Sequence, residues 1–141
     1  MAISRKCVPF TPFDRELSKT TIAIVTAGGV HLKDQEPFNI ADELGDLGFR
    51  VIPPDVDASD LMVTHHHYDH SDADQDINVV FPIEVLRDLQ SEQFLGGVAK
   101  KHIGYMGYTM QLKAMYEGTA PEIANAIDRG SAADAVVLTG G

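Results

Sequence analysis

The chain has 141 residues, about the length of one folded domain. Hydrophobic residues make up 44% of it and charged residues 23%, a balance typical of a folded globular protein and not of a disordered chain. The net charge of −10 disfavours binding to nucleic acids and to anionic membrane surfaces, because both would repel the chain. A single cysteine, Cys7, excludes an intrachain disulfide and a zinc site built from several cysteines.

No apolar run approaches the roughly 20 residues that a membrane helix needs, and the first ten residues lack the pattern of a signal peptide. We therefore expect a cytoplasmic protein without membrane contacts. Residues 1–19 contain Pro9 and Pro12 and predict an extended N-terminal arm. Residues 20–141 are expected to form one α/β domain.

The first regular element in chain order is an apolar, β-branched segment over residues 20–27. Such a segment is typical of a central strand that is covered on both faces, and Gly28 and Gly29 end it. The elements expected next are a short helix or turn over residues 40–47, a strand over residues 49–52 and a brief strand over residues 61–64.

The second half of the chain alternates helices with strands. The acidic stretch over residues 71–78 has the composition of a loop, and Pro82 opens a helix that runs to about Phe94. Alternation of this kind predicts an α/β fold with a parallel sheet and flanking helices, in a flavodoxin-like or Rossmann-like order. The remaining elements are expected as strands over residues 102–106 and 133–139 and helices over residues 111–116 and 121–128.

Ligands of parallel sheets bind beyond the carboxyl ends of the strands. The strand over residues 133–139 has no helix after it, which leaves one face of the sheet uncovered. We expect either that the C-terminal part of the fold is missing or that a partner covers this face, with self-association into a homo-oligomer. The predicted strand ends carry Gly28-Gly29, His65 to Asp69, Gly107 and Gly140-Gly141.

A histidine cluster directly after an apolar stretch permits three interpretations. His65, His67, Asp69 and His70 match the H-x-H-x-D-H motif with which the metallo-β-lactamase superfamily binds zinc for hydrolysis. Only one later histidine, His102, could supply a further imidazole ligand of that superfamily. The second interpretation is a solvated polar loop. The third is a substrate-facing role, because imidazoles titrate near neutral pH and can transfer protons.

Six segments, taken in order, carry a resemblance to a known family. They are VPFTPF, TIAIVTAGGVHLKDQEPFN, FRVIP, LMVTHHHYDHSDADQDINVVFPIEVLRDL, HIGYMG and ADAVVLTGG. They resemble selenoprotein B of the glycine, sarcosine, betaine and D-proline reductases, and most of all its short D-proline reductase type. The resemblance covers nearly the whole chain, and the run from His65 to Ile83 is more specific than the zinc motif within it.

The resemblance implies a subunit of a selenium-dependent oxidoreductase that reductively cleaves the bond between the α-carbon and nitrogen of an amino acid. In that family a selenocysteine, and then a cysteine, follow the strand that matches residues 133–139. A pyruvoyl group on a partner subunit activates the amine, the selenolate attacks the α-carbon, and the cysteine releases the product. We expect a UGA codon directly after Gly141, and we expect the 141 residues alone to be inactive, because they contain neither reactive residue.

The candidate site residues are inferred from their chemistry and their expected place at the strand ends. His65, His67 and Asp69 are the candidate catalytic residues, and an imidazole is suited to donate a proton to the leaving amine. Two alternatives remain: a zinc hydrolase that uses His65, His67, Asp69 and His70, and a non-catalytic module that binds a partner subunit. The candidate substrate-binding residues are Gly28, Gly29, His31, Gly140 and Gly141, with His31 binding a carboxylate.

Overall fold

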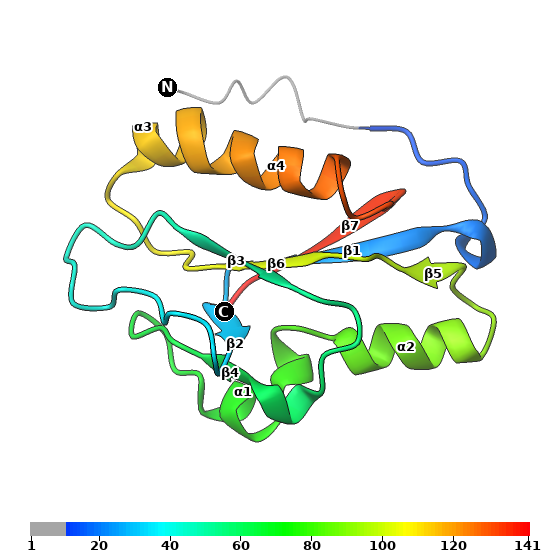
Figure 1. Cartoon of the computed structure of the whole chain (residues 1–141), viewed down its shortest axis with the longest axis horizontal. Helices are drawn as coiled ribbons and strands as arrows, with labels where there is room; N and C mark the ends of the chain where they lie inside the picture. The colour runs from blue at the N-terminus through cyan, green and yellow to red at the C-terminus, as the bar shows by residue number, and fades with distance from the viewer. Residues whose placement is uncertain (1–10) are drawn as a thin grey trace.

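The computed structural model describes residues 11–141 and contains a five-stranded, mostly parallel sheet (Figure 1). β1 (Thr21–Thr26) is central, and β7 (Ala135–Thr139) pairs in parallel with one of its edges. β5 (Gly97–Val98) and β6 (His102–Tyr105) pair in parallel with the other edge. β3 (Phe49–Ile52) lies beyond β6. The α/β class predicted from the sequence is confirmed.

Helices cover both faces of this sheet (Figure 1). On one face lies α4 (Ala120–Asp128), which follows α3 (Leu112–Ala114) and the π-helical segment η4 (Met115–Thr119). α2 (Ile83–Ser91) lies on the other face. Alternate residues of β1 enter the two cores: Ala23 and Val25 pack with α4, and Ile24 packs with α2. The apolar segment is therefore covered on both sides, as its composition predicts.

A separate two-stranded ribbon packs beneath the sheet on the α2 side (Figure 1). Its strands are β2 (Val30–Leu32) and β4 (Leu61–Val63), which pair antiparallel. The ribbon approaches β6 closely, since a Cβ at Gly104 would lie 1.9 Å from the Val30 carbonyl oxygen. Glycine at this position therefore allows the two layers to pack. Short helices α1 (Ser71–Gln75), η2 (Ala58–Asp60) and η3 (Ile77–Val79) flank the ribbon.

One expectation about the sheet is confirmed only in part, and another is wrong. The sheet is not wholly parallel, because β3 pairs antiparallel with β6. An edge strand tolerates this, and the irregular segment over residues 33–48 carries the chain round to that edge. The strand predicted over residues 61–64 exists as β4, but it pairs with β2 and lies outside the sheet, since Gly29 turns the chain so that it doubles back on β4. The flavodoxin-like order is not confirmed.

The acidic stretch over residues 71–78 is also not a loop, because it contains α1 and η3. Aspartates stabilise both helix starts: the Asp69 carboxylate, just before the stretch, accepts a hydrogen bond from the Ser71 amide, and Asp76 caps η3 by accepting one from the Asn78 amide. Aspartate is as favourable at a helix start as it is in a loop, so composition alone does not separate the two. Residues 40–47 form turns, one of the two forms expected.

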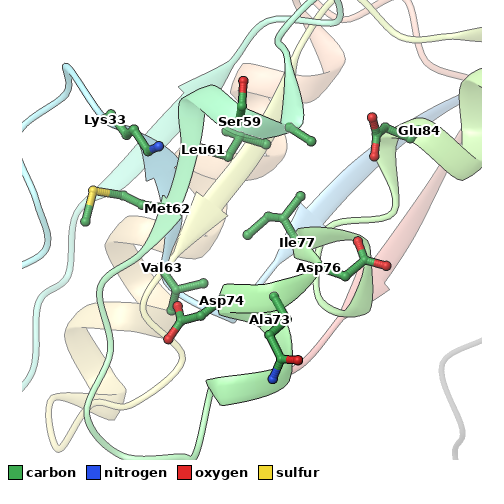
Figure 2. A pocket seen from close by; sticks show the side chains of 12 residues that line it. Lys33, Ser59, Leu61, Met62, Val63, Ala73, Asp74, Asp76, Ile77 and Glu84 are labelled. Carbon is green, nitrogen blue, oxygen red and sulfur yellow. The ribbon is translucent and has the colours of Figure 1, made fainter.

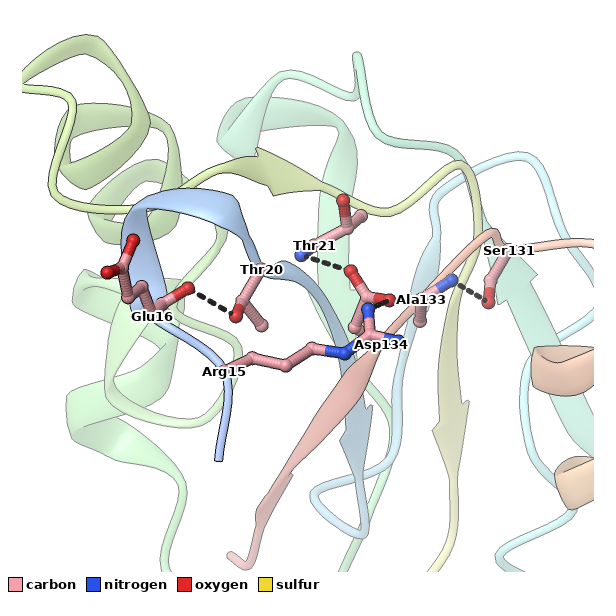
Figure 3. Close-up of polar contacts among 7 residues, drawn as sticks. All are labelled: Arg15, Glu16, Thr20, Thr21, Ser131, Ala133 and Asp134. Carbon is pink, nitrogen blue, oxygen red and sulfur yellow. Dashed lines mark hydrogen bonds and ion pairs between the residues drawn. The ribbon is translucent and has the colours of Figure 1, made fainter. Parts of the chain in front are cut away.

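The chain before β1 is tied to the amino ends of β1 and β7 (Figure 3). Arg15 forms an ion pair with Asp134, whose carboxylate also accepts a hydrogen bond from the Thr21 amide at 3.0 Å. The Thr20 hydroxyl donates to the Glu16 carbonyl oxygen at 2.9 Å. The predicted arm over residues 1–19 is thus anchored in its described part, and residues 1–10 lie outside the described residues. Within residues 11–141, no helix has the length and apolar character to cross a membrane.

Candidate functional site

The carboxyl ends of the three long parallel strands meet at one edge of the sheet. Backbone bonds link the residues there: the Ala27 amide donates to the Thr139 carbonyl oxygen, and the Gly107 amide donates to the Ala27 carbonyl oxygen, each at 2.9 Å. Gly28 forms an isolated bridge with Met106. The glycines after β1, β6 and β7 thus lie together, as the strand-end argument predicts. We call this place the glycine edge (Gly28, Gly29, Gly107, Gly140 and Gly141).

Tyr68 joins the segment over residues 65–70, which we call the histidine loop, to the glycine edge. Its hydroxyl donates a hydrogen bond to the Gly28 carbonyl oxygen at 2.8 Å. Gly141 lies against its ring, since a Cβ at position 141 would be 2.5 Å from the ring carbons. Burial, aided by the negative charge of Asp74, raises the pKa of the Tyr68 hydroxyl. Tyr68 is therefore a neutral hydrogen-bond donor at physiological pH.

His65 is the buried member of the histidine loop. Its Nδ1 accepts a hydrogen bond from the His67 amide at 3.1 Å, so a neutral His65 carries its proton on Nε2. The ring packs edge-on against Tyr68, with 4.8 Å between centroids. Burial lowers the pKa of His65, and the neighbouring His67 and His66 lower it further. The neutral imidazole is therefore the favoured form.

His67 lies at the surface and stacks on Tyr108, with 3.4 Å between ring centroids. Its pKa is lowered by partial desolvation and by His66. The two stacked rings border a pocket of about 510 Å³, large enough for a small amino acid. The other lining residues are Ile40, Ala41, Glu43, Leu44, His66 and Met110.

Asp69 and His70 do not line this pocket. The Asp69 carboxylate accepts a hydrogen bond from the Ser71 amide at the start of α1, and this bond lowers the pKa of Asp69. His70 Nδ1 lies 2.9 Å from the Asp74 carboxylate. Within residues 11–141, no three His, Cys, Asp or Glu side chains are placed to hold one metal ion. The H-x-H-x-D-H spacing does not bring its side chains to one point.

His31 lies inside the protein and has no exposed ring nitrogen. Its Nε2 lies 2.7 Å from the Thr64 hydroxyl, and its Nδ1 lies 2.7 Å from the Leu32 carbonyl oxygen. The ring is fully buried and packs edge-on against Phe38. Its two hydrogen bonds hold the ribbon together and leave neither nitrogen for a substrate carboxylate in this conformation.

A second pocket, of about 410 Å³, lies between β4 and the α1–η3 segment (Figure 2). Lys33 borders it, and Asp74, Asp76 and Glu84 supply carboxylates. The side-chain amide of Asn78 donates to both Asp76 and Glu84, so these two carboxylates already accept hydrogen bonds within the protein. No residue of the glycine edge lines this pocket, and we assign it no ligand.

Sequence reasoning missed three residues that shape the glycine edge. Tyr68 and Tyr108 are aromatic residues next to histidines and glycines, but no spacing rule marks them as site residues. Thr26 is fully buried, and its hydroxyl accepts a hydrogen bond from the Gly28 amide at 3.1 Å. The only available signal was position, since Thr26 and Tyr108 each lie within two residues of a strand-end glycine and Tyr68 lies in the histidine run.

Comparison with known proteins relates the chain to one family. A family model described as glycine/sarcosine/betaine reductase selenoprotein B matches residues 2–141. The D-proline reductase subunit gamma of Acetoanaerobium sticklandii is 45% identical over 132 residues, covering 94% of this chain and 53% of the relative. The glycine reductase complex component B subunit gamma of Carboxydothermus hydrogenoformans is 31% identical, over 94% of this chain and 30% of the relative.

A third relative, the sarcosine reductase complex component B subunit beta of Peptoclostridium acidaminophilum, is 30% identical over 71% of this chain. No solved structure gives a significant match. The chain spans about half the length of the first relative and about a third of the second. Because the family model matches almost every residue, the chain belongs to the glycine/sarcosine/betaine reductase selenoprotein B family.

Proposed function

We propose that this chain forms part of a selenium-dependent amino-acid reductase subunit and that the glycine edge is where its reacting group lies. The observation that carries the proposal is the convergence of Gly28, Tyr68 and Gly141, with Tyr68 directly following His67, which lines a pocket. A group attached after Gly141 would start next to the Tyr68 ring. Parallel sheets place their ligands at this edge.

The residues present suit a selenocysteine in that position. A selenolate supplies a nucleophile that is ionised at neutral pH. The Tyr68 ring lies against Gly141, and the His65 imidazole packs against that ring. A neutral His65 carries its proton on Nε2, so it can donate a hydrogen bond to a nearby anion. His67 is exposed in the pocket wall, where it can hold or release a proton as the amine leaves.

The proposed substrate is D-proline, and the proposed partner is the subunit that carries the pyruvoyl group. The higher identity to a D-proline reductase subunit supports this choice over glycine, sarcosine or betaine. The pocket beside His67 also contains apolar side chains, Ile40, Leu44 and Met110 among them, which suit the ring carbons of proline better than a charged methylammonium group. We propose that residues 1–141 alone have no reductase activity.

The test replaces the matched region of the A. sticklandii subunit with residues 1–141 of this chain and reconstitutes the reductase complex. Dithiol-dependent reduction is then measured with D-proline, glycine, sarcosine and betaine. We expect turnover with D-proline and at least about tenfold less with the other three substrates.

The isolated 141-residue chain, assayed with the same partner subunits, controls for activity that does not need the remaining polypeptide. Turnover by the isolated chain would contradict the proposal. A correctly assembled chimeric complex that reduces none of the four substrates would contradict it as well.

A further inference from the structure

β7 and α4 form an apolar groove on the surface of the protein, which we call the β7 groove (Val25, Ala120, Ile123, Ala124, Ile127, Asp128, Ala133, Val136 and Leu138). Leu138 is 76% exposed and Val136 is 41% exposed, although both belong to a strand of the central sheet. Such exposure is unusual in a parallel sheet, whose faces are normally covered. The volume of the groove is about 390 Å³.

The free edge of β7 adjoins the same groove. Among residues 11–141, β7 pairs only with β1, so its other edge offers backbone donors and acceptors to a further strand. Val136 and Leu138 lie on the α4 face of β7, while the Thr139 hydroxyl on the opposite face donates to the Val80 carbonyl oxygen at 2.6 Å. The exposed apolar side chains of β7 therefore lie on its α4 face.

The order in which the chain forms its strands and helices indicates which kind of element would cover the β7 groove. β6, α4 and β7 form a crossover unit that passes over β1, with α4 on one face of the sheet (Figure 1). Crossovers between parallel strands are right-handed in nearly all proteins. A further parallel strand at the free edge of β7 continues in the same direction across the sheet. Its connecting helix therefore falls on the α4 face, over Val136 and Leu138.

The dimensions agree with a helix in this position. Because α4 leads into β7, the two elements run in opposite directions, and the groove follows the whole strand from Leu138 back to Ala133. Five strand residues span about 17 Å, which a helix of about 11 residues matches. The α4 side of the groove is lined by Ala120 and Ala124, whose small side chains allow a helix to approach closely.

We propose that the β7 groove and the free edge of β7 bind a helix followed by a parallel strand, supplied by the polypeptide that the longer relatives possess beyond the region matching this chain. The A. sticklandii subunit is about twice as long as its match, so it contains enough additional chain for such a unit. The helix has an apolar stripe facing Val136 and Leu138. This inference rests on the sheet geometry and the length of the relative, and not on reductase chemistry.

The test joins residues 1–141, at Gly141, to the polypeptide of the A. sticklandii subunit that lies outside the match, with cysteine in place of any selenocysteine. Backbone hydrogen exchange over residues 133–139 is compared between this fusion and the 141-residue chain. We expect exchange at least about tenfold slower in the fusion. Leu138→Glu should remove this protection, and Leu112→Glu, at a leucine that is 72% exposed outside the groove, should retain it.

A second measurement does not require the fusion to fold. In a Cys7→Ser background, Leu138→Cys is alkylated with and without the separately produced polypeptide. We expect about tenfold slower alkylation when the polypeptide is bound, as for a thiol that becomes buried. Unchanged exchange and unchanged alkylation would together overturn the proposal.

A concentration-dependent dimer of the 141-residue chain with slow exchange over residues 133–139 would also overturn it, by assigning the groove to a second copy. Neither readout uses turnover. Failure of the docking inference and failure of the proposed function are therefore distinguishable.

Discussion

At the scale of single residues, histidines in this chain serve different purposes according to what surrounds them. His67 is exposed and borders a pocket, whereas His31 and His102 are fully buried. His102 Nδ1 accepts a hydrogen bond from the Ile24 amide at 2.9 Å, in the middle of the sheet. His102 Nε2 has no hydrogen-bond partner among the described residues. The fold therefore requires a neutral His102.

Burial, aided by the positive charge of Arg87, lowers the pKa of His102 to about 4. In the unfolded chain a histidine has a pKa of about 6.5, so between these two values the unfolded state binds a proton that the folded state does not. The stabilising contribution is complete above pH 6.5 and declines as the pH falls toward 4. The whole effect amounts to about 3 kcal/mol.

We predict that His102→Asn weakens this pH dependence, because asparagine keeps an acceptor for the Ile24 amide but does not titrate. Urea unfolding at pH 7 and pH 4.5 should show that the wild-type chain loses about 2 kcal/mol more stability than His102→Asn over this interval. The control, His66→Asn, removes an exposed histidine and should lose as much as the wild type. Equal losses in the wild type and His102→Asn would show that His102 is not the group responsible.

Tyr68 gives a second prediction at this scale. Tyr68→Phe removes the hydrogen bond to the Gly28 carbonyl oxygen and should lower the free energy of unfolding by about 1 kcal/mol. It should also speed hydrogen exchange at Gly28 and Gly29, because the hydroxyl joins the histidine loop to this turn. Tyr116→Phe alters a tyrosine that is 68% exposed and is the matched control. If both variants are equally stable, the contact does not hold the loop.

At the scale of secondary-structure elements, glycine positions decide how closely the layers pack. Gly104→Ala would place a Cβ 1.9 Å from the Val30 carbonyl oxygen, so the ribbon must move away from the sheet. We predict a loss of about 3 kcal/mol in stability, measured by chemical denaturation. Gly118→Ala is the control, because no atom lies within 4 Å of the added Cβ and alanine favours a helix. Comparable losses in the two variants would refute the packing argument.

Elements with a strong apolar pattern could be predicted from the sequence. β1, β3, α2 and α4 lie within about three residues of their expected places, because their composition and the flanking Gly and Pro residues agree. β2 and β5 were not predicted, since strands of three and two residues carry too little pattern. The partner of β4 depends on a contact between distant segments, which local pattern does not encode.

The sequence could indicate the position of the candidate site, but only some of the residues that form it. Gly28, Gly107 and Gly141 meet because parallel strands end at one edge, and a sequence can indicate strand ends. The directions of the side chains could not be predicted. His31 and Asp69 form internal hydrogen bonds, while Tyr68 lies against Gly141, and these outcomes depend on packing across the ribbon.

At the scale of the whole molecule, helices and the ribbon cover most of both faces of the sheet, and one apolar area beside β7 is exposed. α2 and the ribbon cover one face of the sheet, and α4 covers part of the other (Figure 1). The β7 groove remains exposed. The glycine edge and the β7 groove meet at the carboxyl end of β7. Polypeptide docked in the groove would therefore start beside the proposed reacting position, which connects the two proposals in space.

The most direct test of the central claim, that the glycine edge forms the reductase site, is D-proline turnover by the reconstituted chimeric complex carrying His67→Ala. If His67 transfers a proton to the leaving amine, turnover should fall about 100-fold. His70→Ala, which removes the imidazole paired with Asp74 outside the pocket, should leave turnover within about twofold of the unsubstituted chimera. An unchanged rate for His67→Ala would contradict the account, and equal losses in both variants would favour a metal site instead.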